Sequence, residues 1–489
     1  MNHRTRELSV SVSIAAILLL VWAVLASAPK SSAIPAFSRK YQTSCTTCHN
    51  NYPELNDFGE AFKKNGFKFP KDDETFVKEP PVLLGSKAQR EAFPGAVYPG
   101  EIPGYLPIAF RFLGNMSVNS SQPKPVQASS FVPRTDLFAP DTLVLIGAGS
   151  FGPNLSFWID DDLSVGGSGA DGGLGDGYIK YNDLGRIFKL PKNALNVRFG
   201  QFELDLPFTQ ARSIYLSEFD IYGQTNVSGI PGGTANNQFI LGEPQRGIEF
   251  GGTPNNGNFA WSVTLANGSN ASTAFRNSKD VYVRLSQKFN LERDPESRNA
   301  VQAAGPTGPR DHTSIRLGFL YYYGRNQLNQ GSAISPTQGT IDEPFYRIGG
   351  DIRFKYRHLE AFGLGLFGRD NNHFFDEEGT GTFLVAPPAK FSGGFAGVNY
   401  WLYPWMIATM RYDFVNSFPD FANSADSGLP LKSHTRNRFS PGVQVLMRAN
   451  LKFAAEYQHT WEQPYLDPVT DTIKYFRPNT FVAGIDYVF

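Results

Sequence analysis

From residue 106 to the C-terminus, the chain alternates apolar and polar residues in segments of about ten residues, separated by stretches rich in Gly, Asn, Asp, Ser and Pro. In the last segment the apolar residues share one parity: Phe481, Ala483, Ile485, Tyr487 and Phe489. Thr480, Gly484 and Asp486 have the opposite parity. This alternation is expected of a strand with lipid on one face and a polar lumen on the other.

About sixteen such segments can be counted, an even number that suits a closed antiparallel barrel. Examples are 108–112, 259–265, 281–285, 315–323 and 451–457. Short connections near residues 357–358, 403–404 and 449–450 alternate with long ones near 325–343, 369–390, 417–437 and 462–478. A sandwich or propeller would explain the strands but not this rhythm or the terminal Phe489, which resembles the assembly signal of bacterial outer-membrane barrels. The sequence therefore predicts a mainly β protein, with a porin-like transmembrane antiparallel β-barrel of about 16 strands in residues 106–489.

The N-terminus predicts export. Arg4 and Arg6 precede an apolar run from Ser9 to Leu25, and the small residues 31–33 provide a cleavage site. We therefore expect residues 1–33 to be a signal peptide. An uncleaved membrane anchor is the alternative, and in both cases the chain leaves the cytoplasm.

Composition narrows the function classes. The chain has 45 basic and 45 acidic residues, which leaves no argument for nucleic acid as a partner. Aromatic residues make up 14% of the chain, and this excess suits an all-β protein whose strands alternate their faces.

The chain has two cysteines, and both lie in the pentapeptide Cys45-Thr46-Thr47-Cys48-His49. In such a CxxCH motif the two thiols form thioethers with haem, and the imidazole that follows ligates the iron, because one turn presents all three to one porphyrin edge. A Cys45–Cys48 redox disulfide and half of a zinc site are the alternatives. Zinc would need further ligands, and no other Cys or His occurs from residue 34 to 311. We expect one covalent haem c, held by Cys45 and Cys48, with His49 as an axial ligand.

The residues after the motif suit a small domain that covers the haem. Residues 53–64 predict a short helix, with Pro53 in its first turn and Asn65-Gly66 at its end. Leu55, Phe58 and Phe62 would share one face of this helix, and Phe67 and Phe69 would extend the apolar surface. Residues 34–77 are thus predicted to be a helical cytochrome c-like domain, and the Pro-rich residues 78–105 a linker to the barrel.

The region from Ala36-Phe37 through the CxxCH motif to Pro53-Glu54-Leu55-Asn56-Asp57-Phe58-Gly59 and Asn65-Gly66-Phe67 resembles the N-terminal domain of the fused outer-membrane cytochrome–porins. The resemblance covers about 35 residues. Members of this family join a monohaem cytochrome to a β-barrel, and the best known oxidise iron. The resemblance implies extracellular Fe(II) as the electron donor and a periplasmic c-type cytochrome or other carrier as the acceptor.

The second axial ligand of the iron cannot be assigned. Met116 and His459 have the parity of the lipid-facing residues, and His358 falls in a predicted periplasmic turn. The remaining candidates are His373 and His434, expected in outside loops, and His312, near the start of a strand. Any loop histidine could fold inward, and the iron could also be five-coordinate.

Charged residues on the second parity are expected to face the lumen: Arg284, Arg316, Arg347, Asp351, Arg353, Lys355, Arg411, Asp413, Lys452 and Glu456. We expect most of them to form a solvated channel wall, and some could instead pair with the N-terminal domain or the haem propionates. Two acidic segments expected in loops, residues 160–162 and His373 with 376–378, could attract Fe(II), although solvated loops explain them as well.

An apolar band about 25 Å tall separates donor and acceptor. The haem domain is therefore expected inside the barrel or on its periplasmic side. The predicted function is outer-membrane electron transfer. Two alternatives stay open: a solute porin in which the haem is a sensor or plug, and a conduit that exports electrons.

Overall fold

The computed structural model describes residues 35–69, 73–95, 100–120, 135–152, 154–163, 173–223, 239–254, 257–268, 278–291, 313–329, 340–375, 383–417, 436–462, 465–467, 472–474 and 478–489. The predicted signal peptide, His312, His434 and the acidic residues 376–378 lie outside these ranges.

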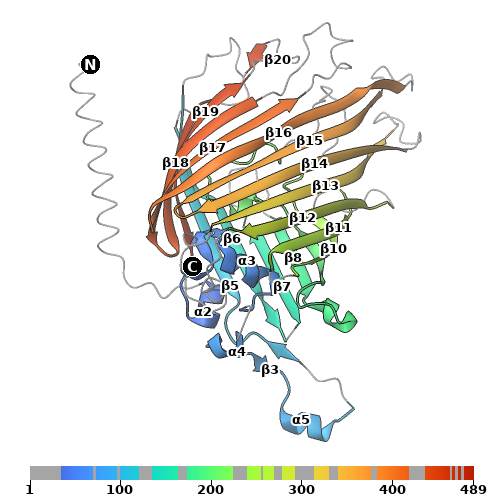
Figure 1. Cartoon of the computed structure of the whole chain (residues 1–489), viewed down its shortest axis with the longest axis vertical. Coiled ribbons are helices and arrows are strands. Elements are labelled where there is room, and N and C mark those ends of the chain that lie inside the picture. Colours follow the sequence, from blue (N-terminus) through green and yellow to red (C-terminus); the bar gives the residue numbers. More distant parts are fainter. Residues whose placement is uncertain are drawn as a thin grey trace, which may run out of the picture.

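Sixteen antiparallel strands form a closed barrel, which confirms the predicted fold class (Figure 1). Neighbours in sequence are hydrogen-bonded neighbours in the wall, and β22 closes the ring against β5. The terminal residue takes part in this closure, because Phe110 N donates to Phe489 O at 2.7 Å and Phe489 N donates to Phe110 O at 2.9 Å.

The wall consists of β5 Ile108–Asn119, β6 Thr135–Phe151, β7 Leu155–Asp162, β8 Gly173–Tyr181, β9 Asn196–Phe202, β10 Gln245–Gly252, β11 Phe259–Ala266, β12 Asp280–Asn290, β13 Ser314–Asn329, β14 Thr340–Tyr356, β15 Leu359–Phe375, β16 Phe383–Tyr403, β17 Met406–Ser417, β18 Arg436–Arg448, β19 Leu451–Glu462 and β22 Thr480–Val488. Three small two-stranded sheets accompany it: β1 His49–Asn51 with β2 Glu54–Leu55, β3 Val82–Leu83 with β4 Glu101–Ile102, and β20 Tyr465–Asp467 with β21 Thr472–Lys474.

The two faces of the wall differ as the alternation predicts. In β22 the outward Phe481 and Ile485 are 40% and 44% exposed, whereas the inward Asp486 is 3% exposed. A closed barrel with an even number of strands and an apolar outer face has the architecture of an outer-membrane barrel. Among the described residues, no helix is long and apolar enough to cross a membrane.

The strands extend further than the sequence pattern predicts. The short connections at 357–358 and 449–450 are confirmed, and the one expected near 403–404 lies at 404–405, because Tyr403 is the last residue of β16. In the two expected long loops 325–343 and 369–390, the described residues 325–329, 340–343, 369–375 and 383–390 all belong to strands, and β16 alone has 21 residues. Because about 9–11 residues suffice to cross the bilayer, these ends project beyond it and need no apolar face, so the alternation that marks a strand fades there.

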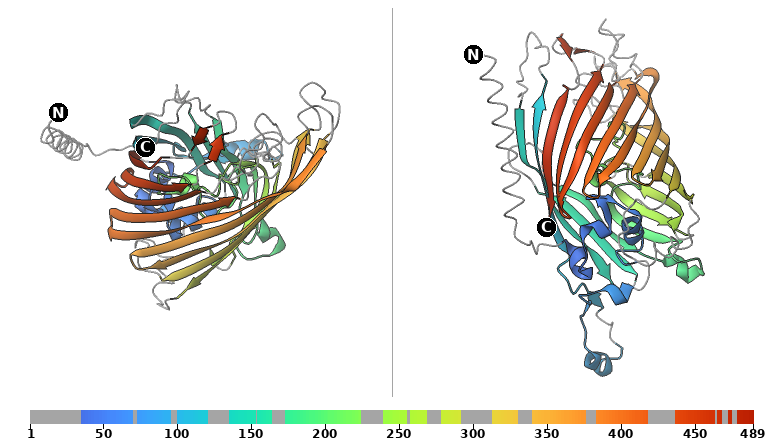
Figure 2. Two further views of the ribbon diagram at one scale, coloured as in Figure 1. Left: turned by 90° about the horizontal axis from the view of Figure 1, so that it is seen from above. Right: turned by 60° about the vertical axis from the view of Figure 1, so that its left-hand side comes forward.

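The N-terminal segment, residues 35–69, contains α2 Ala36–Tyr41, the 3-10 turn η1 Cys45–Thr47 and α3 Asp57–Lys64. Figure 2 shows these elements within the outline of the barrel, near one of its ends. The helix predicted from Pro53 begins only at Asp57, because the side chain of Asn56 caps it by accepting from Gly59 N at 2.8 Å. Its predicted end is confirmed, with Asn65 at the C-cap and Gly66 at a φ of 71°.

The residues predicted as a linker include short elements: β3, α5 Lys87–Ala92 and β4. α4 Asp73–Phe76 precedes them. In Figure 1 α5 projects away from the barrel on the side of the N-terminal segment.

A second insert lies inside the barrel. It consists of residues 203–223 and 239–244, between β9 and β10, and is called the inner segment below. The largest buried apolar cluster of the described residues is shared between this segment and the inward face of the wall. The sequence pattern gave no sign of such an internal layer.

Candidate functional site

Ionic contacts hold the N-terminal segment against the lumen wall. The carboxylate of Asp57 lies 2.6 Å from Lys288 Nζ and 3.5 Å from Lys355 Nζ. Lys452 Nζ donates to Tyr52 O at 2.8 Å. Three strands from distant parts of the sequence therefore contact this segment.

The opposite side of the N-terminal segment contacts β7 and β8. Lys180 Nζ donates to Lys64 O at 3.1 Å, and the ring centroids of Phe67 and Trp158 lie 5.7 Å apart. Lys68 Nζ reaches Gly152 O, just after β6, at 2.8 Å. The segment thus bridges opposite parts of the barrel wall.

The lumen charges are buried and paired, so the expected solvated channel wall is wrong for most of them. The shortest ion-pair distances are 2.7 Å for Arg284–Asp351, 2.5 Å for Arg347–Asp370 and 2.8 Å for Arg411–Asp413. Arg353 pairs with Glu360 at 3.0 Å. The N-terminal and inner segments occupy the space that water would fill in an open channel, and pairing replaces the lost hydration. Lys355 and Lys452 contact the N-terminal segment, in line with the expectation that some lumen charges pair with that domain.

The two thiols lie at one 3-10 turn. Ser44 caps η1, and Cys48 N donates to Cys45 O at 3.1 Å. Both cysteines are free and partly buried. Burial raises the pKa of both thiols, and the neighbouring Cys45 adds to the shift that brings the pKa of Cys48 to about 12.

His49 has a defined orientation. Its Nδ1 lies 3.1 Å from Pro53 O, and because a carbonyl only accepts, Nδ1 carries the proton. Burial lowers the pKa of His49 to about 4, which keeps the ring neutral. The Nε2 lone pair is therefore the one available to a metal, and the Nδ1–H···O=C contact is the usual outer-sphere support of a ligating histidine.

A cavity of about 670 Å³ has Cys45, Cys48 and His49 in its wall. Sites for cofactors and drug-sized ligands have volumes of about 300–1,000 Å³. Apolar side chains come to this cavity from three parts of the chain: Phe37, Tyr41, Leu55, Phe62, Phe67 and Phe69 from the N-terminal segment, Val144, Ile146 and Trp158 from the wall, and Ile214, Tyr215 and Leu216 from the inner segment. Its volume, its apolar lining and its two thiols beside one oriented imidazole fit a haem c.

The predicted aromatic cover is only partly in this cavity. Leu55 and Phe62 line it, whereas Phe58 packs edge-to-face on Phe69 with ring centroids 5.0 Å apart. Phe62 and Phe67, 4% and 3% exposed, belong to a small aromatic core that also includes Tyr41. The aromatic residues therefore serve as core and as cavity wall at once.

The structure adds no second axial ligand among the described residues. Met116 is 36% exposed, and His459 packs against the exposed Trp461 with ring centroids 4.2 Å apart. Both observations agree with the expected outward direction of Met116 and His459. His358 is exposed in the turn between β14 and β15. His373 lies within β15 rather than in an outside loop.

Within the described part of the chain, His49 is the one histidine that lines the cavity, and no methionine lines it. His312 and His434 lie outside the described residues, so the second ligand stays unassigned.

The acidic residues expected in an outside loop are in a strand instead. Residues 160–162 end β7, and Asp160 and Asp162 line the cavity that also holds the two thiols. Asp160 accepts from Trp158 Nε1 at 2.7 Å. No group of three or more His, Cys, Asp or Glu side chains arranged to hold a metal ion occurs among the described residues.

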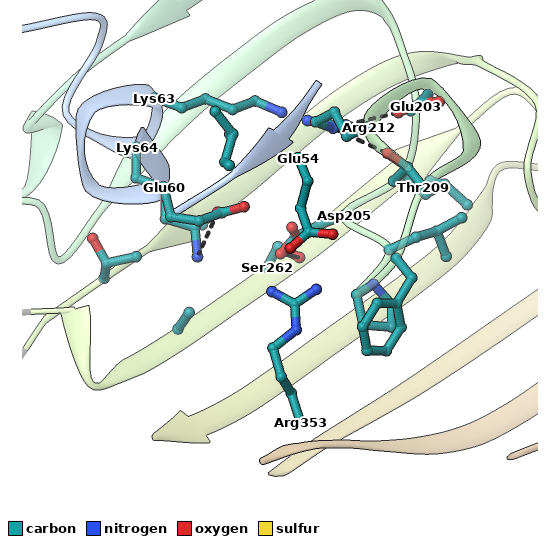
Figure 3. Close-up of a pocket in the computed structure, with 18 of the residues that line it drawn as sticks. Glu54, Glu60, Lys63, Lys64, Glu203, Asp205, Thr209, Arg212, Ser262 and Arg353 are labelled. Atoms are coloured by element: carbon teal, nitrogen blue, oxygen red, sulfur yellow. Dashed lines mark hydrogen bonds and ion pairs between the residues drawn. The ribbon is translucent and has the colours of Figure 1, made fainter. Parts of the chain in front are cut away.

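A smaller, charged pocket of about 150 Å³ lies between the N-terminal and inner segments (Figure 3). Figure 3 shows Glu54 directed toward Arg353, and Arg212 lies 2.7 Å from Glu203. Burial and the nearby Glu360 raise the pKa of Glu54 to about 7. Sequence reasoning missed this pocket, because its charges come from segments that meet only in the folded barrel.

No protein-family model and no curated protein sequence matches the chain. Several solved structures are similar to the chain, each with a TM-score below 0.5. The channel DcaP of Acinetobacter baumannii is 12% identical, with a TM-score of 0.45 over 78% of this chain and 96% of that one. Salmonella typhi OmpF, solved in complex with daunomycin, is 10% identical, with a TM-score of 0.47 over 79% of this chain and 98% of that one. Pseudomonas putida OprB is 11% identical, with a TM-score of 0.42 over 78% and 94%.

Proposed function

We propose that this protein transfers electrons across the outer membrane through one haem c, taking them from extracellular Fe(II) and passing them to a periplasmic c-type cytochrome. One observation carries the proposal: the CxxCH motif lines a cavity of about 670 Å³ formed by the N-terminal segment, the barrel wall and the inner segment. Fe(II) and the periplasmic partner rest on the family resemblance of residues 36–67.

Three residues of the motif have a defined task in this proposal. The thiols of Cys45 and Cys48 would hold the haem covalently, and His49 Nε2 would ligate its iron. Pro53 O fixes the imidazole through Nδ1–H, at 3.1 Å. When bound, the haem supplies one-electron redox chemistry, whose potential depends on ligation and burial.

The position of the cavity supports transfer across the membrane. An apolar band about 25 Å tall separates the two aqueous sides, too far for efficient transfer between carriers left outside it. A redox group within the barrel would replace this one long electron-transfer step with two shorter ones. Each Fe(II) gives up one electron and becomes Fe(III), and the periplasmic carrier gains that electron.

A solute channel is the second candidate, and the porin-type barrel favours it. A conduit that carries electrons outward would use the same residues in the opposite direction. The candidates differ in what crosses the membrane, electrons or solutes, and the two electron-transfer candidates differ in direction.

The test uses the full chain, expressed with c-type haem maturation. Fe(II) is added to oxidised outer membranes, and the haem absorption bands are recorded. Reduced bands should appear with the wild type and be absent with Cys48→Ala, whose barrel should still assemble. A haem that forms but stays oxidised would refute Fe(II) as the donor, and absence of any covalent haem would refute the proposal. Liposome swelling would favour the channel.

A further inference from the structure

The inner segment fills part of the lumen with apolar side chains. Ten of its residues belong to the largest buried apolar cluster of the described chain: Leu204, Leu206, Phe208, Ile214, Tyr215, Phe219, Ile221, Tyr222, Phe239 and Leu241. Ile221 is 0% exposed and Leu241 is 1% exposed. This segment is therefore packed as a protein core, without the exposure of a loop beside a water-filled pore.

The facing wall is apolar where an open channel would be polar. Ten inward residues from β12 to β17 complete the cluster: Tyr282, Leu320, Tyr322, Phe345, Phe362, Leu364, Leu366, Phe391, Phe395 and Val415. Leu320 and Tyr322 are 0% exposed. Because a water-filled barrel has a polar interior, this part of the lumen is built to receive the inner segment.

Aromatic contacts cross the boundary between segment and wall. Phe219 lies 4.4 Å from Phe395 between ring centroids, and Phe239 stacks on Tyr322 at 4.1 Å. Phe208 reaches Phe362 at 5.0 Å. Such contacts leave no room for a layer of water between the two surfaces.

Buried polar side chains of the wall bind the backbone of the inner segment. Arg411 donates to Ser217 O at 3.0 Å and to Glu218 O at 2.5 Å. Arg438 also donates to Glu218 O and pairs with Asp220 at 3.0 Å. These charge-assisted bonds satisfy backbone groups that would otherwise be buried without partners.

Other strands hold the remaining parts of the inner segment. Gln444 Nε2 donates to Ile214 O at 2.5 Å, and Tyr282 OH donates to Asp205 O at 2.9 Å. The backbone N–H of Glu203 reaches Asp176 of β8 at 2.7 Å. Contacts from β8 to β18 thus attach the segment around much of the circumference.

We infer that the inner segment is an apolar septum that prevents hydrated ions and small solutes from passing through the barrel. An ion would have to lose its hydration to enter a core of this kind, which is unfavourable. The N-terminal segment covers the side of the lumen near β7, where Phe67 meets Trp158. The septum does not depend on haem, so this inference goes beyond the proposed electron transfer and can fail independently of it.

The test measures conductance of the purified full chain in planar bilayers with concentrated KCl, beside a general porin in the same bilayers. The wild type should conduct at least about ten-fold less than the porin, because a porin lumen is an aqueous channel. Porin-like conductance of the wild type would overturn the inference, whatever the variants do.

Two variants locate the barrier. Ile221→Lys places a charge in the septum and should raise conductance, whereas Ile187→Lys, at a position 68% exposed in η2 Leu184–Phe188, should not. Heat-modifiable electrophoretic mobility verifies that each barrel is assembled. If the assembled Ile221→Lys barrel conducts no more than the wild type, the inferred septum is refuted.

A third variant, Cys48→Ala, should lack covalent haem and should conduct no more than the wild type. If it conducts, the haem-bearing segment is the barrier and the inference is wrong. The absorption bands measured for the proposed function are a separate readout, so failure of one proposal is distinguishable from failure of the other.

Discussion

Replacing Asp57 with Asn should loosen the N-terminal segment from the barrel. Asp57 contacts Lys288 of β12 and Lys355 of β14, at 2.6 and 3.5 Å. The lysine side chains are 13% and 8% exposed, whereas that of Asp57 is 30% exposed. The variant keeps the shape of the side chain but leaves two largely buried ammonium groups without their carboxylate.

The expected magnitude lies between two limits. An exposed ion pair contributes about 0–1 kcal/mol, and breaking a fully buried one costs about 3–5 kcal/mol. The partial exposure of Asp57 places the loss of docking free energy at about 2 kcal/mol, an increase of about thirty-fold in the undocked population.

Native-state hydrogen exchange of peptides from residues 35–69 measures that population. Glu60→Gln is the matched control on the same helix, because Glu60 is 38% exposed and 4.0 Å from Lys64. The control should change docking by less than about 0.5 kcal/mol. A double-mutant cycle with Lys288→Met separates the ion pair from the effect of an acidic residue in the first helical turn. Equal exchange in Asp57→Asn and Glu60→Gln, or no coupling in the cycle, would refute the reasoning.

The same contact predicts a pH dependence. Burial alone would raise the pKa of Asp57, but the charges of Lys355 and Lys288 outweigh it and hold the pKa well below 3.8. The undocked carboxyl therefore binds protons more readily, and docking is favoured above about pH 3.8 and weakens as the pH falls through the docked pKa. After correction for intrinsic rates, exchange of the segment should accelerate in this acidic range. The Asp57→Asn variant should lack this acceleration of exchange at low pH. If the acceleration persists in the variant, groups other than Asp57 cause it.

Two further substitutions test packing near the motif and inside the wall. Gly59→Ala would bring a Cβ into the backbone oxygen of Cys48 and should lower the yield of covalent haem, whereas Gly95→Ala, which meets no atom within 4 Å, should not; equal haem yields by pyridine haemochrome assay would contradict this. Arg284→Met leaves the carboxylate of Asp351 buried without its partner and should destabilise the barrel by about 3–5 kcal/mol. Adding Asp351→Leu should restore most of that loss in denaturant unfolding, and a double variant as unstable as the single one would show that the charge is not the cause.

The barrel and the motif could be predicted from the sequence because both are local patterns. Alternation in β22 depends only on which face each residue presents, and a one-residue shift would reverse it. The CxxCH motif places two thiols and an imidazole within five consecutive residues. The orientation of His49 is less accessible from sequence, because the pattern places its partner Pro53 in the first turn of the helix. Asn56 is a favourable N-cap residue and Asp57 an acidic residue in the first turn, so this pair indicates a helix that starts at Asp57 and not at Pro53.

The interior of the barrel was decided by tertiary structure alone. Asp57 and Lys355 are 298 residues apart, and Arg411 and Ser217 are 194 apart. No local pattern identifies such partners. A charged residue on the inward face of a strand follows the same alternation whether water or another segment covers it. The sequence therefore predicts a solvated channel wall where the structure has buried ion pairs. The residues 203–223 and 239–244 have no strand periodicity, and their role depends on the ring of strands that encloses them. The sequence thus determines the wall and the CxxCH motif, whereas the fold determines what fills the lumen.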